Sequence, residues 1–308
     1  MDDRTLQRFG RLRKRLALYL GAAGVCAVLG AAAMAAPAIA GEESCAECHE
    51  SATASFNASV HARVWRGANG CQSCHGSADQ HLNGEQSKNT IISFAKDGGR
   101  SAEEMSAQCL SCHSGSKHVA LWESSAHKGE GLSCTSCHSG HSGQSKNLKQ
   151  SQSELCFSCH MDIRAESKRQ SHHPIKEGKI SCSDCHDPHG SFGSKNIKAD
   201  SINELCYTCH ADKRGPFMYE HPPVEEDCLT CHTAHGSNHG KLLTQKVPTI
   251  CQACHDWTRH PGTPYTQANS FVSSAPAGRG GVARSCTNCH TTIHGSSGPN
   301  TLGLRFIK

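Results

Sequence analysis

Residues 182–190 read Cys182-Ser-Asp-Cys185-His186-Asp-Pro-His189-Gly190, and this stretch contains the pattern that decides the fold. Its first five residues are one copy of the pentapeptide C-x-x-C-H, the attachment motif of c-type haem. The spacing follows from the chemistry, because two thiols about one helical turn apart can each bond one vinyl group of a porphyrin. The adjacent imidazole then reaches the iron from the same side.

The motif occurs ten times and takes up 20 of the 21 cysteines. A single C-x-x-C pair also fits a redox dithiol or half of a zinc site, and cysteine pairs alone fit a disulfide scaffold. None of these requires a histidine at the fifth position of every copy, so the repeat favours covalent haem. The sequence therefore predicts ten haem c groups, attached through Cys45, Cys48, Cys71, Cys74, Cys109, Cys112, Cys134, Cys137, Cys156, Cys159, Cys182, Cys185, Cys206, Cys209, Cys228, Cys231, Cys251, Cys254, Cys286 and Cys289. The predicted proximal iron ligands are His49, His75, His113, His138, His160, His186, His210, His232, His255 and His290.

Lone histidines flank every second motif, one shortly before it and one shortly after it. Ten lone histidines for ten haems predict a second, distal imidazole for each iron. The predicted distal ligands are His61, His81, His127, His141, His173, His189, His221, His235, His260 and His294. Local echoes support this phase, since three histidines of the second kind precede Gly-Ser: His189, His235 and His294.

Three histidines are left over, and we expect them to be surface residues or contacts of haem propionates: His118, His172 and His239. His172 adjoins His173 and is the alternative to it as a ligand. Thioether ligation is a further alternative to the distal histidines, through Met105, Met161 or Met218.

The unit motif, histidine, motif, histidine repeats five times and predicts five tandem dihaem modules. Their approximate bounds are 41–108, 109–155, 156–205, 206–250 and 251–308. Aromatic residues make up only 5% of the chain and the connecting segments show no strand periodicity. We therefore expect mostly coil with short α-helices around a linear array of ten haems, without significant β-sheet, and with the macrocycles as the core.

Capping signals predict short helices at four of the odd-numbered motifs. The pattern Ser-x-x-Glu, which is typical of a capping box, begins at Ser101, Ser151 and Ser201, just ahead of three of them. Pro248 can serve the first turn of a fourth helix, at the ninth motif. The longest stretches without a motif, 76–108 and 256–285, are the expected linkers.

Residues 1–40 have the layout of a cleaved secretory signal peptide. A basic segment is followed by an apolar run at 16–33 and by Ala38-Ile39-Ala40, a cleavage site of the A-x-A type. A retained membrane anchor is the alternative. Residues 1–40 hold six of the 31 basic and two of the 27 acidic residues, so 25 of each remain in the mature chain. Nothing in this balance favours a nucleic-acid partner.

Two imidazoles saturate each iron and leave no position for a substrate, which favours electron transfer over enzymatic catalysis. Ligation by two histidines also lacks the thioether that raises the potential of His/Met cytochromes. A soluble periplasmic electron shuttle or store fits the same pattern. A multihaem reductase enzyme would need an open iron position, and no motif departs from C-x-x-C-H.

The chain resembles the MtrA/DmsE/PioA family of periplasmic decahaem c-type cytochromes. The resemblance covers about 42–298 and includes the stretches 173–189, 206–216, 220–237 and 284–296. It implies a periplasmic subunit associated with the outer membrane, inside an MtrB-type β-barrel. There it would link a periplasmic or inner-membrane c-type cytochrome donor to an extracellular multihaem cytochrome or terminal reductase, in a direction that the resemblance leaves open.

Overall fold

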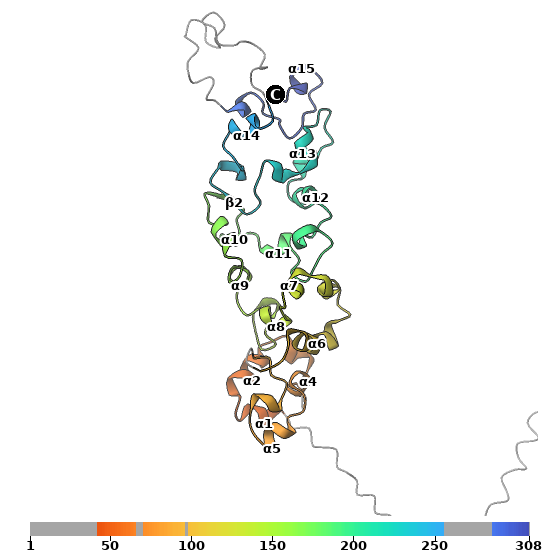
Figure 1. Cartoon of the computed structure of the whole chain (residues 1–308), viewed down its shortest axis with the longest axis vertical. Helices are drawn as coiled ribbons and strands as arrows, with labels where there is room; N and C mark the ends of the chain where they lie inside the picture. Colours follow the sequence, from red (N-terminus) through yellow and green to blue (C-terminus); the bar gives the residue numbers. More distant parts are fainter. Residues whose placement is uncertain (1–41, 66–69, 96–97, 256–284, 308) are drawn as a thin grey trace, which may run out of the picture. The chain divides into compact units, whose positions relative to one another are not determined.

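The computed structural model describes residues 42–65, 70–95, 98–255 and 285–307 (Figure 1). All of these belong to one of two units into which the chain divides, Ile39–Lys308. The predicted signal peptide, the predicted ligand His260 and nearly all of the expected linker 256–285 lie outside the described residues.

Short helices joined by coil make up the described residues, and the longest helix has 12 residues. The α-helices are α1 (Glu42–Ala46), α2 (Glu50–Asn57), α3 (His61–Val64), α4 (Gln72–His75), α5 (Asp79–Asn83), α6 (Ala102–His113), α7 (Ala126–Gly129), α8 (Cys134–Cys137), α9 (Gln152–Phe157), α10 (Met161–Glu166), α11 (Cys182–Cys185), α12 (Ile202–Tyr207), α13 (Pro222–Glu226), α14 (Thr249–Gln252) and α15 (Thr301–Leu304). The 3-10 helices are η1 (Lys88–Thr90), η2 (Lys117–Val119), η3 (Trp122–Ser124), η4 (Ser145–Asn147), η5 (Ser194–Asn196), η6 (Ala211–Lys213), η7 (Cys228–Thr230), η8 (Gly240–Leu242) and η10 (Cys286–Asn288).

Regular strand pairing among the described residues is confined to two short antiparallel strands, β1 (Ser171–His172) and β2 (Gly236–Ser237). Ser171 pairs with Ser237 and His172 with Gly236, so the strands join two predicted modules. The expected fold of coil and short helices without a significant sheet is therefore confirmed for this part of the chain.

The helices expected at the odd-numbered motifs are present as α6, α9, α12 and α14. Ser101 and Glu104 form a complete capping box at the start of α6. Ser201 accepts a hydrogen bond from the Glu204 amide of α12, whereas Ser151 makes no side-chain cap on α9. The predicted capping pattern is thus complete at one helix, partial at the second and wrong at the third.

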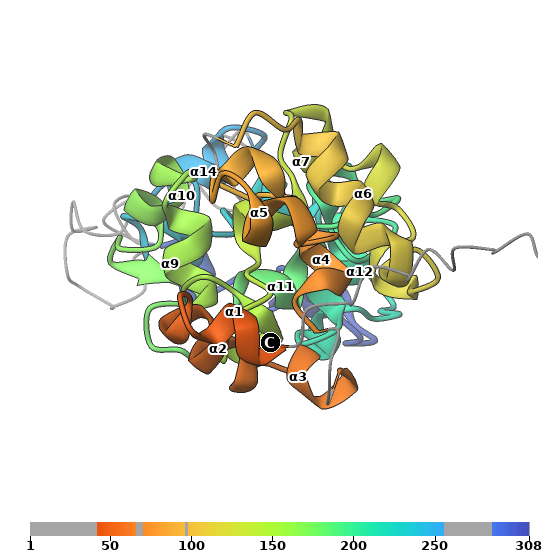
Figure 2. The same ribbon diagram turned by 90° about the horizontal axis from the view of Figure 1, so that it is seen from below.

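Motif-bearing elements pack in pairs. The helix α6 packs on α8, α9 packs on α11, and α12 packs on η7, which brings the third motif to the fourth, the fifth to the sixth and the seventh to the eighth. The helices α9 and α10 lie side by side in the views of Figure 1 and Figure 2. Each motif pair belongs to one predicted module.

Apolar side chains form almost no core in the described part of the chain. Only five are buried there, Phe56, Ala78, Trp122, Phe157 and Ile197, and no large side chain is fully buried. Burying one such side chain contributes only about 2 kcal/mol, so five of them offset little of the entropy lost on folding. Among the described residues, none of the helices combines the length and the apolar character that a bilayer span requires.

Candidate haem-binding site

Nine of the ten predicted distal histidines lie in the described residues, and each faces one motif histidine. Their ring centroids are 5.9–6.3 Å apart. The pairs, with the motif histidine first, are His49–His81, His75–His141, His113–His61, His138–His189, His160–His127, His186–His235, His210–His173, His232–His294 and His255–His221.

This separation is the one that two imidazoles on one metal ion require. A coordinating ring nitrogen lies about 2 Å from the metal, and the ring centroid lies roughly 1 Å further out, which gives about 6 Å between two centroids on opposite sides. Direct stacking of aromatic rings also reaches this range, but nine repeats of one value favour a common geometric cause. The ring pairs therefore fit a haem iron between them.

The pairing follows a rule that crosses the predicted module boundaries. A motif histidine of an even-numbered motif faces the lone histidine that follows the next even motif, as His138 faces His189. From the third motif on, the histidine of an odd-numbered motif faces the first of the two lone histidines of the preceding module, as His160 faces His127. The first motif is different, because His49 faces His81 of its own module.

His173, and not the adjacent His172, takes part in a ring pair. The His173 ring lies 6.3 Å from that of His210. The His172 ring contacts the Arg169 carbonyl at 2.6 Å and the Glu177 carboxylate at 3.2 Å instead. The Glu177 hydrogen bond raises the pKa of His172, which favours the protonated form that cannot bind a metal.

The motif histidines of the even-numbered motifs are oriented through their Nδ1 atoms. Each Nδ1 lies 2.6–3.0 Å from a backbone carbonyl oxygen, so it donates its proton there and leaves Nε2 free to bind iron. The acceptors are the carbonyls of Ile92 for His75, Lys146 for His138, Lys195 for His186, Lys241 for His232 and Arg305 for His290.

Strained turns aim three of these carbonyls. Lys146, Lys195 and Lys241 have φ values of 58°, 52° and 60°, and the residue after each is also left-handed. Non-glycine residues in this region cost on the order of 1 kcal/mol or more, so the surrounding contacts must hold them there. Two of the turns share the tripeptide Ser-Lys-Asn, at 145–147 and 194–196, a repeat that is visible in the sequence. Its role in supporting an iron ligand was not predicted.

The lone histidines that precede even motifs have a matching contact with the next module. His61 Nδ1 contacts the Gly140 carbonyl, His127 that of Pro188 and His173 that of Ala234, at 3.4, 2.9 and 2.7 Å. In each case the acceptor residue directly precedes the lone histidine of the second kind. Each contact thereby holds together two predicted distal histidines that face different motif histidines.

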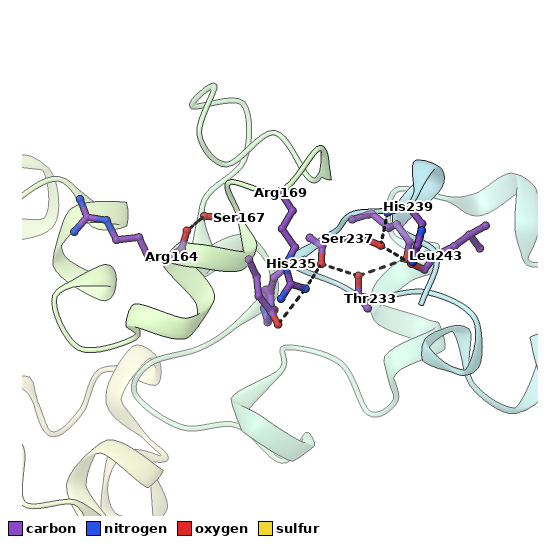
Figure 3. A network of polar contacts seen from close by, with 11 residues as sticks. Arg164, Ser167, Arg169, Thr233, His235, Ser237, His239 and Leu243 are labelled. Atoms are coloured by element: carbon purple, nitrogen blue, oxygen red, sulfur yellow. Dashed lines mark hydrogen bonds and ion pairs between the residues drawn. The ribbon is translucent and has the colours of Figure 1, made fainter. Parts of the chain in front are cut away.

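Glycine follows the lone histidine where two modules approach most closely. A Cβ at Gly236 would lie 1.9 Å from the Glu166 carbonyl oxygen, and one at Gly190 would lie 2.4 Å from that of Leu121. Arg169 donates to the Gly236 carbonyl at 3.1 Å, and Glu166 Oε2 lies 3.5 Å from His235 Nδ1. Figure 3 shows Arg169 beside His235 in this network of polar contacts. The Gly-Ser echo of the sequence thus reflects close backbone packing.

Burial favours the neutral form of five half-buried lone histidines. Desolvation lowers the pKa of His141, His189, His221, His235 and His294. A neutral imidazole has the free lone pair that metal coordination needs. The charge state is therefore the one expected of ligands, in contrast to that of His172.

Cysteines of consecutive motifs interact with one another, in the order of the motifs along the chain. The first cysteines of the two motifs in a module hydrogen-bond, as Cys109 does with Cys134, which lowers the pKa of the Cys134 thiol to about 6 and raises that of Cys109. The second cysteine of an even motif instead interacts electrostatically with that of the next motif, as Cys137 does with Cys159. In a c-type cytochrome these sulfurs are thioethers, so the contacts matter here as positions of attachment sites.

The same alternation runs through most of the described chain. First cysteines meet within modules at Cys156–Cys182, Cys206–Cys228 and Cys251–Cys286. Second cysteines meet between modules at Cys74–Cys112, Cys185–Cys209 and Cys231–Cys254. From the second motif to the tenth, each attachment site therefore adjoins the next.

Buried polar atoms provide a further test of whether haem fits. Four side-chain atoms of the described residues are buried without a hydrogen-bond partner: Ser59 Oγ, Trp122 Nε1, Asn147 Oδ1 and Thr292 Oγ1. Each lies beside a paired histidine in sequence or in space. Unsatisfied buried polar groups are rare in folded proteins. Haem propionates would accept hydrogen bonds from the three of these atoms that can donate, Ser59 Oγ, Trp122 Nε1 and Thr292 Oγ1. The residues present therefore fit haem c.

Comparisons with known proteins agree with this geometry. The family described as the doubled CXXCH motif matches residues 126–165, 172–215 and 221–260. Multiheme cytochrome MtrA of Shewanella baltica (strain OS185) is 37% identical over 274 residues, which cover 84% of this chain and 80% of that protein. The chain thus belongs to the MtrA family of multihaem c-type cytochromes, which bind haem c and transfer electrons.

Proposed function

We propose that this protein carries ten haem c groups, each attached to the two cysteines of a motif and bound axially by two histidines, and that it conducts electrons along the chain. The observation that carries the proposal is the set of nine imidazole pairs at about 6 Å, each joining a motif histidine to a predicted distal histidine.

The tenth pair follows by elimination. His290 donates from Nδ1 to the Arg305 carbonyl, as the other even motif histidines do to their own acceptors. His260 is the predicted distal ligand that the nine pairs leave over, and it lies outside the described residues. We assign it to the iron bound by His290.

When bound, haem c supplies a one-electron carrier at each motif. The two paired histidines of each site would hold the iron between them and leave no place for a substrate, which supports an electron carrier and not an enzyme. The Nδ1 contacts with carbonyl oxygens make the ligating nitrogens more basic. Adjoining attachment sites from the second motif to the tenth provide an order in which electrons can pass.

We further propose that the mature protein, from residue 41, is periplasmic and forms the electron conduit of an outer-membrane complex. An MtrB-type β-barrel would surround it, because polar coil of this kind has no place in contact with lipid. Its donor would be a periplasmic or inner-membrane c-type cytochrome and its acceptor an extracellular multihaem cytochrome or terminal reductase. Family membership supports this placement.

Affinity purification from membranes of the native host tests the conduit. A barrel protein of the outer membrane should co-purify, and labelling reagents outside intact cells should reach part of the cytochrome. Recovery of only a free protein that is fully protected from such reagents would favour a soluble shuttle instead.

Substitution of two neighbouring histidines tests the ligand assignment. His173→Gln should remove one low-spin haem from the electron paramagnetic resonance spectrum and create one high-spin centre. His172→Gln is the matched control and should leave the spectrum unchanged, because the His172 ring contacts the Glu177 carboxylate and His173 is the one that faces a motif histidine. Several high-spin centres in the unaltered protein would contradict axial ligation by two histidines.

A further inference from the structure

The indole of Trp122 is buried without a hydrogen-bond partner for its N–H group. Trp122 is only 6% exposed, and its Nε1 has no partner among the described residues. An unsatisfied buried N–H costs roughly 1–3 kcal/mol, so such groups nearly always have an acceptor in the complete protein. The acceptor must therefore come from something that binds beside this ring.

Trp122 lies against one particular imidazole pair. Its ring centroid is 6.4 Å from that of His189, with an interplanar angle of 68°, and His189 faces His138 at 5.9 Å. His189 also hydrogen-bonds the backbone of His118, four residues before the tryptophan. The segment from 118 to 122 thus surrounds the distal side of the fourth haem site.

The approach of this segment is fixed by the backbone. A Cβ at Gly190 would lie 2.4 Å from the Leu121 carbonyl oxygen, so the two backbone segments are in contact directly beside the tryptophan. The backbone just before Trp122 therefore packs against the segment that carries His189. The indole is held beside the fourth haem site.

Haem c offers a donor few choices. Its four pyrrole nitrogens bind iron and its vinyl groups have become thioethers, so the propionate carboxylates are its hydrogen-bond acceptors. Resting on the proposed function, we propose that the Trp122 N–H donates a hydrogen bond to a propionate of the haem attached at Cys134 and Cys137. Trp122 is then a positioning residue that sets the orientation and charge of that propionate.

The first module provides a natural comparison. Phe56 stands five residues before His61, as Trp122 stands five residues before His127. Phe56 also lies edge-on to a distal histidine, with its ring 6.1 Å from that of His141 and an interplanar angle of 75°. The edge-on ring is thus common to both modules, and only the second module adds an N–H group.

The proposed bond has a definite electrostatic sign. A donor to a propionate draws negative charge away from the haem and so disfavours the ferric, more positive state. Removal of the donor should stabilise the ferric state and lower the reduction potential of that haem. Hydrogen bonds to charged groups are stronger than those between neutral groups, which makes the effect measurable.

The test uses Trp122→Phe, which reproduces the residue found in the first module. In the holoprotein we expect one of ten haems to shift to lower potential in a redox titration followed by electron paramagnetic resonance. The expected change is up to about tenfold in the reduction equilibrium, or about 59 mV for one electron. Trp65→Phe is the control, since Trp65 lies beside His61 but is partly exposed, and it should shift no haem.

Ultraviolet resonance Raman spectra give a second readout that reports on the indole N–H itself and does not depend on the haem potentials. The difference between unaltered protein and Trp122→Phe should contain an indole whose N–H is hydrogen-bonded. An indole without such a bond, or a variant with ten unchanged low-spin haems and unchanged potentials, would overturn the proposal and leave the proposed function intact. High-spin haem in the unaltered protein would instead count against the proposed function.

Discussion

The first module and the interior modules solve the same ligation problem differently. In the first module, His49 faces His81 across 32 residues of its own module. In the interior modules every described pair joins two modules, as His186 and His235 do. One site of the first module is therefore completed within that module, whereas its other two pairs, His113–His61 and His75–His141, and those of the interior modules join neighbouring modules.

The residue that follows the second lone histidine varies among the modules. His189, His235 and His294 are followed by glycine, and at Gly190 and Gly236 a side chain would collide with the preceding module. His81 is followed by Leu82. In the second module His141 is followed by Ser142, so glycine occupies this place in the third, fourth and fifth modules.

The largest expected effect comes from breaking an exchanged pair. His189→Ala should remove one low-spin haem and lower the free energy of unfolding by on the order of 3 kcal/mol, because the His138–His189 pair joins two modules. His81→Ala should also remove one low-spin haem but cost only about 1 kcal/mol, since its partner belongs to the same module. Denaturant unfolding and electron paramagnetic resonance measure the two quantities.

Added imidazole is the control for both variants, since it should restore the low-spin signal without restoring the link between modules. Equal losses of stability in the two variants would show that exchanged ligands do not hold the interior modules together.

The next effect tests close packing in the interior. Gly236→Ala should lower the unfolding free energy by about 2 kcal/mol, because the new Cβ would lie 1.9 Å from the Glu166 carbonyl oxygen. Gly240→Ala is the matched control, since nothing lies within 4 Å of its added Cβ. Chemical unfolding of the two holoproteins provides the comparison. A Gly236→Ala protein as stable as the control would rule out close approach at this junction.

A smaller effect is expected where the interior begins, at the start of α6. Ser101→Ala should lower the free energy of unfolding by about 1 kcal/mol, because Ser101 Oγ accepts a hydrogen bond from the Glu104 amide at 3.1 Å. Ser151→Ala should change stability by less than about 0.5 kcal/mol, because Ser151 makes no side-chain cap on α9. Thermal unfolding distinguishes them. If both substitutions cost the same, the capping difference between these helices has no energetic weight.

The smallest effect concerns pH. Hydrogen bonds from the backbone and side chain of Ser101 lower the pKa of Glu104 below its ordinary value. A depressed carboxyl pKa adds stability above the unfolded value of 4.5, and this stability disappears as pH falls through the folded pKa. Glu104→Gln should therefore narrow the difference in Tm between pH 6 and pH 3. An unchanged difference would mean that this carboxylate contributes nothing measurable.

The local parts of the site were predictable because their chemistry is local. The C-x-x-C-H spacing identifies each attachment site, and the lone histidines stand at repeating places around the even motifs. Nine of the ten predicted distal histidines then lie opposite a motif histidine. Even the choice between His172 and His173, which the sequence leaves open, depends on contacts only a few residues away.

The partners of these histidines were not predictable from local pattern. His75 and His141 are 66 residues apart, and nothing in either segment specifies the other. The echoes Gly-Ser and Ser-Lys-Asn were visible, but their reasons are a carbonyl of another module and a strained turn behind an iron ligand. Capping was only partly predictable, because Glu154 lies 3.3 Å from Arg164 in an ion pair and Ser151 makes no side-chain cap.

The fixed offset of the ligand exchange constrains how such a chain can grow. Each interior module supplies one lone histidine to the module before it and one to the module after it, and it receives one from each. In residues 156–205, His189 and His173 are supplied, and His160 and His186 face the histidines received. A tandem copy of that segment would supply and receive histidines in the same way, so every motif histidine would keep a partner. Deletion of half a module, such as the part with His160 and His173, would remove one haem site and take the partner from one other motif histidine, His210. The exchange of histidines therefore favours growth by whole modules of two haem sites.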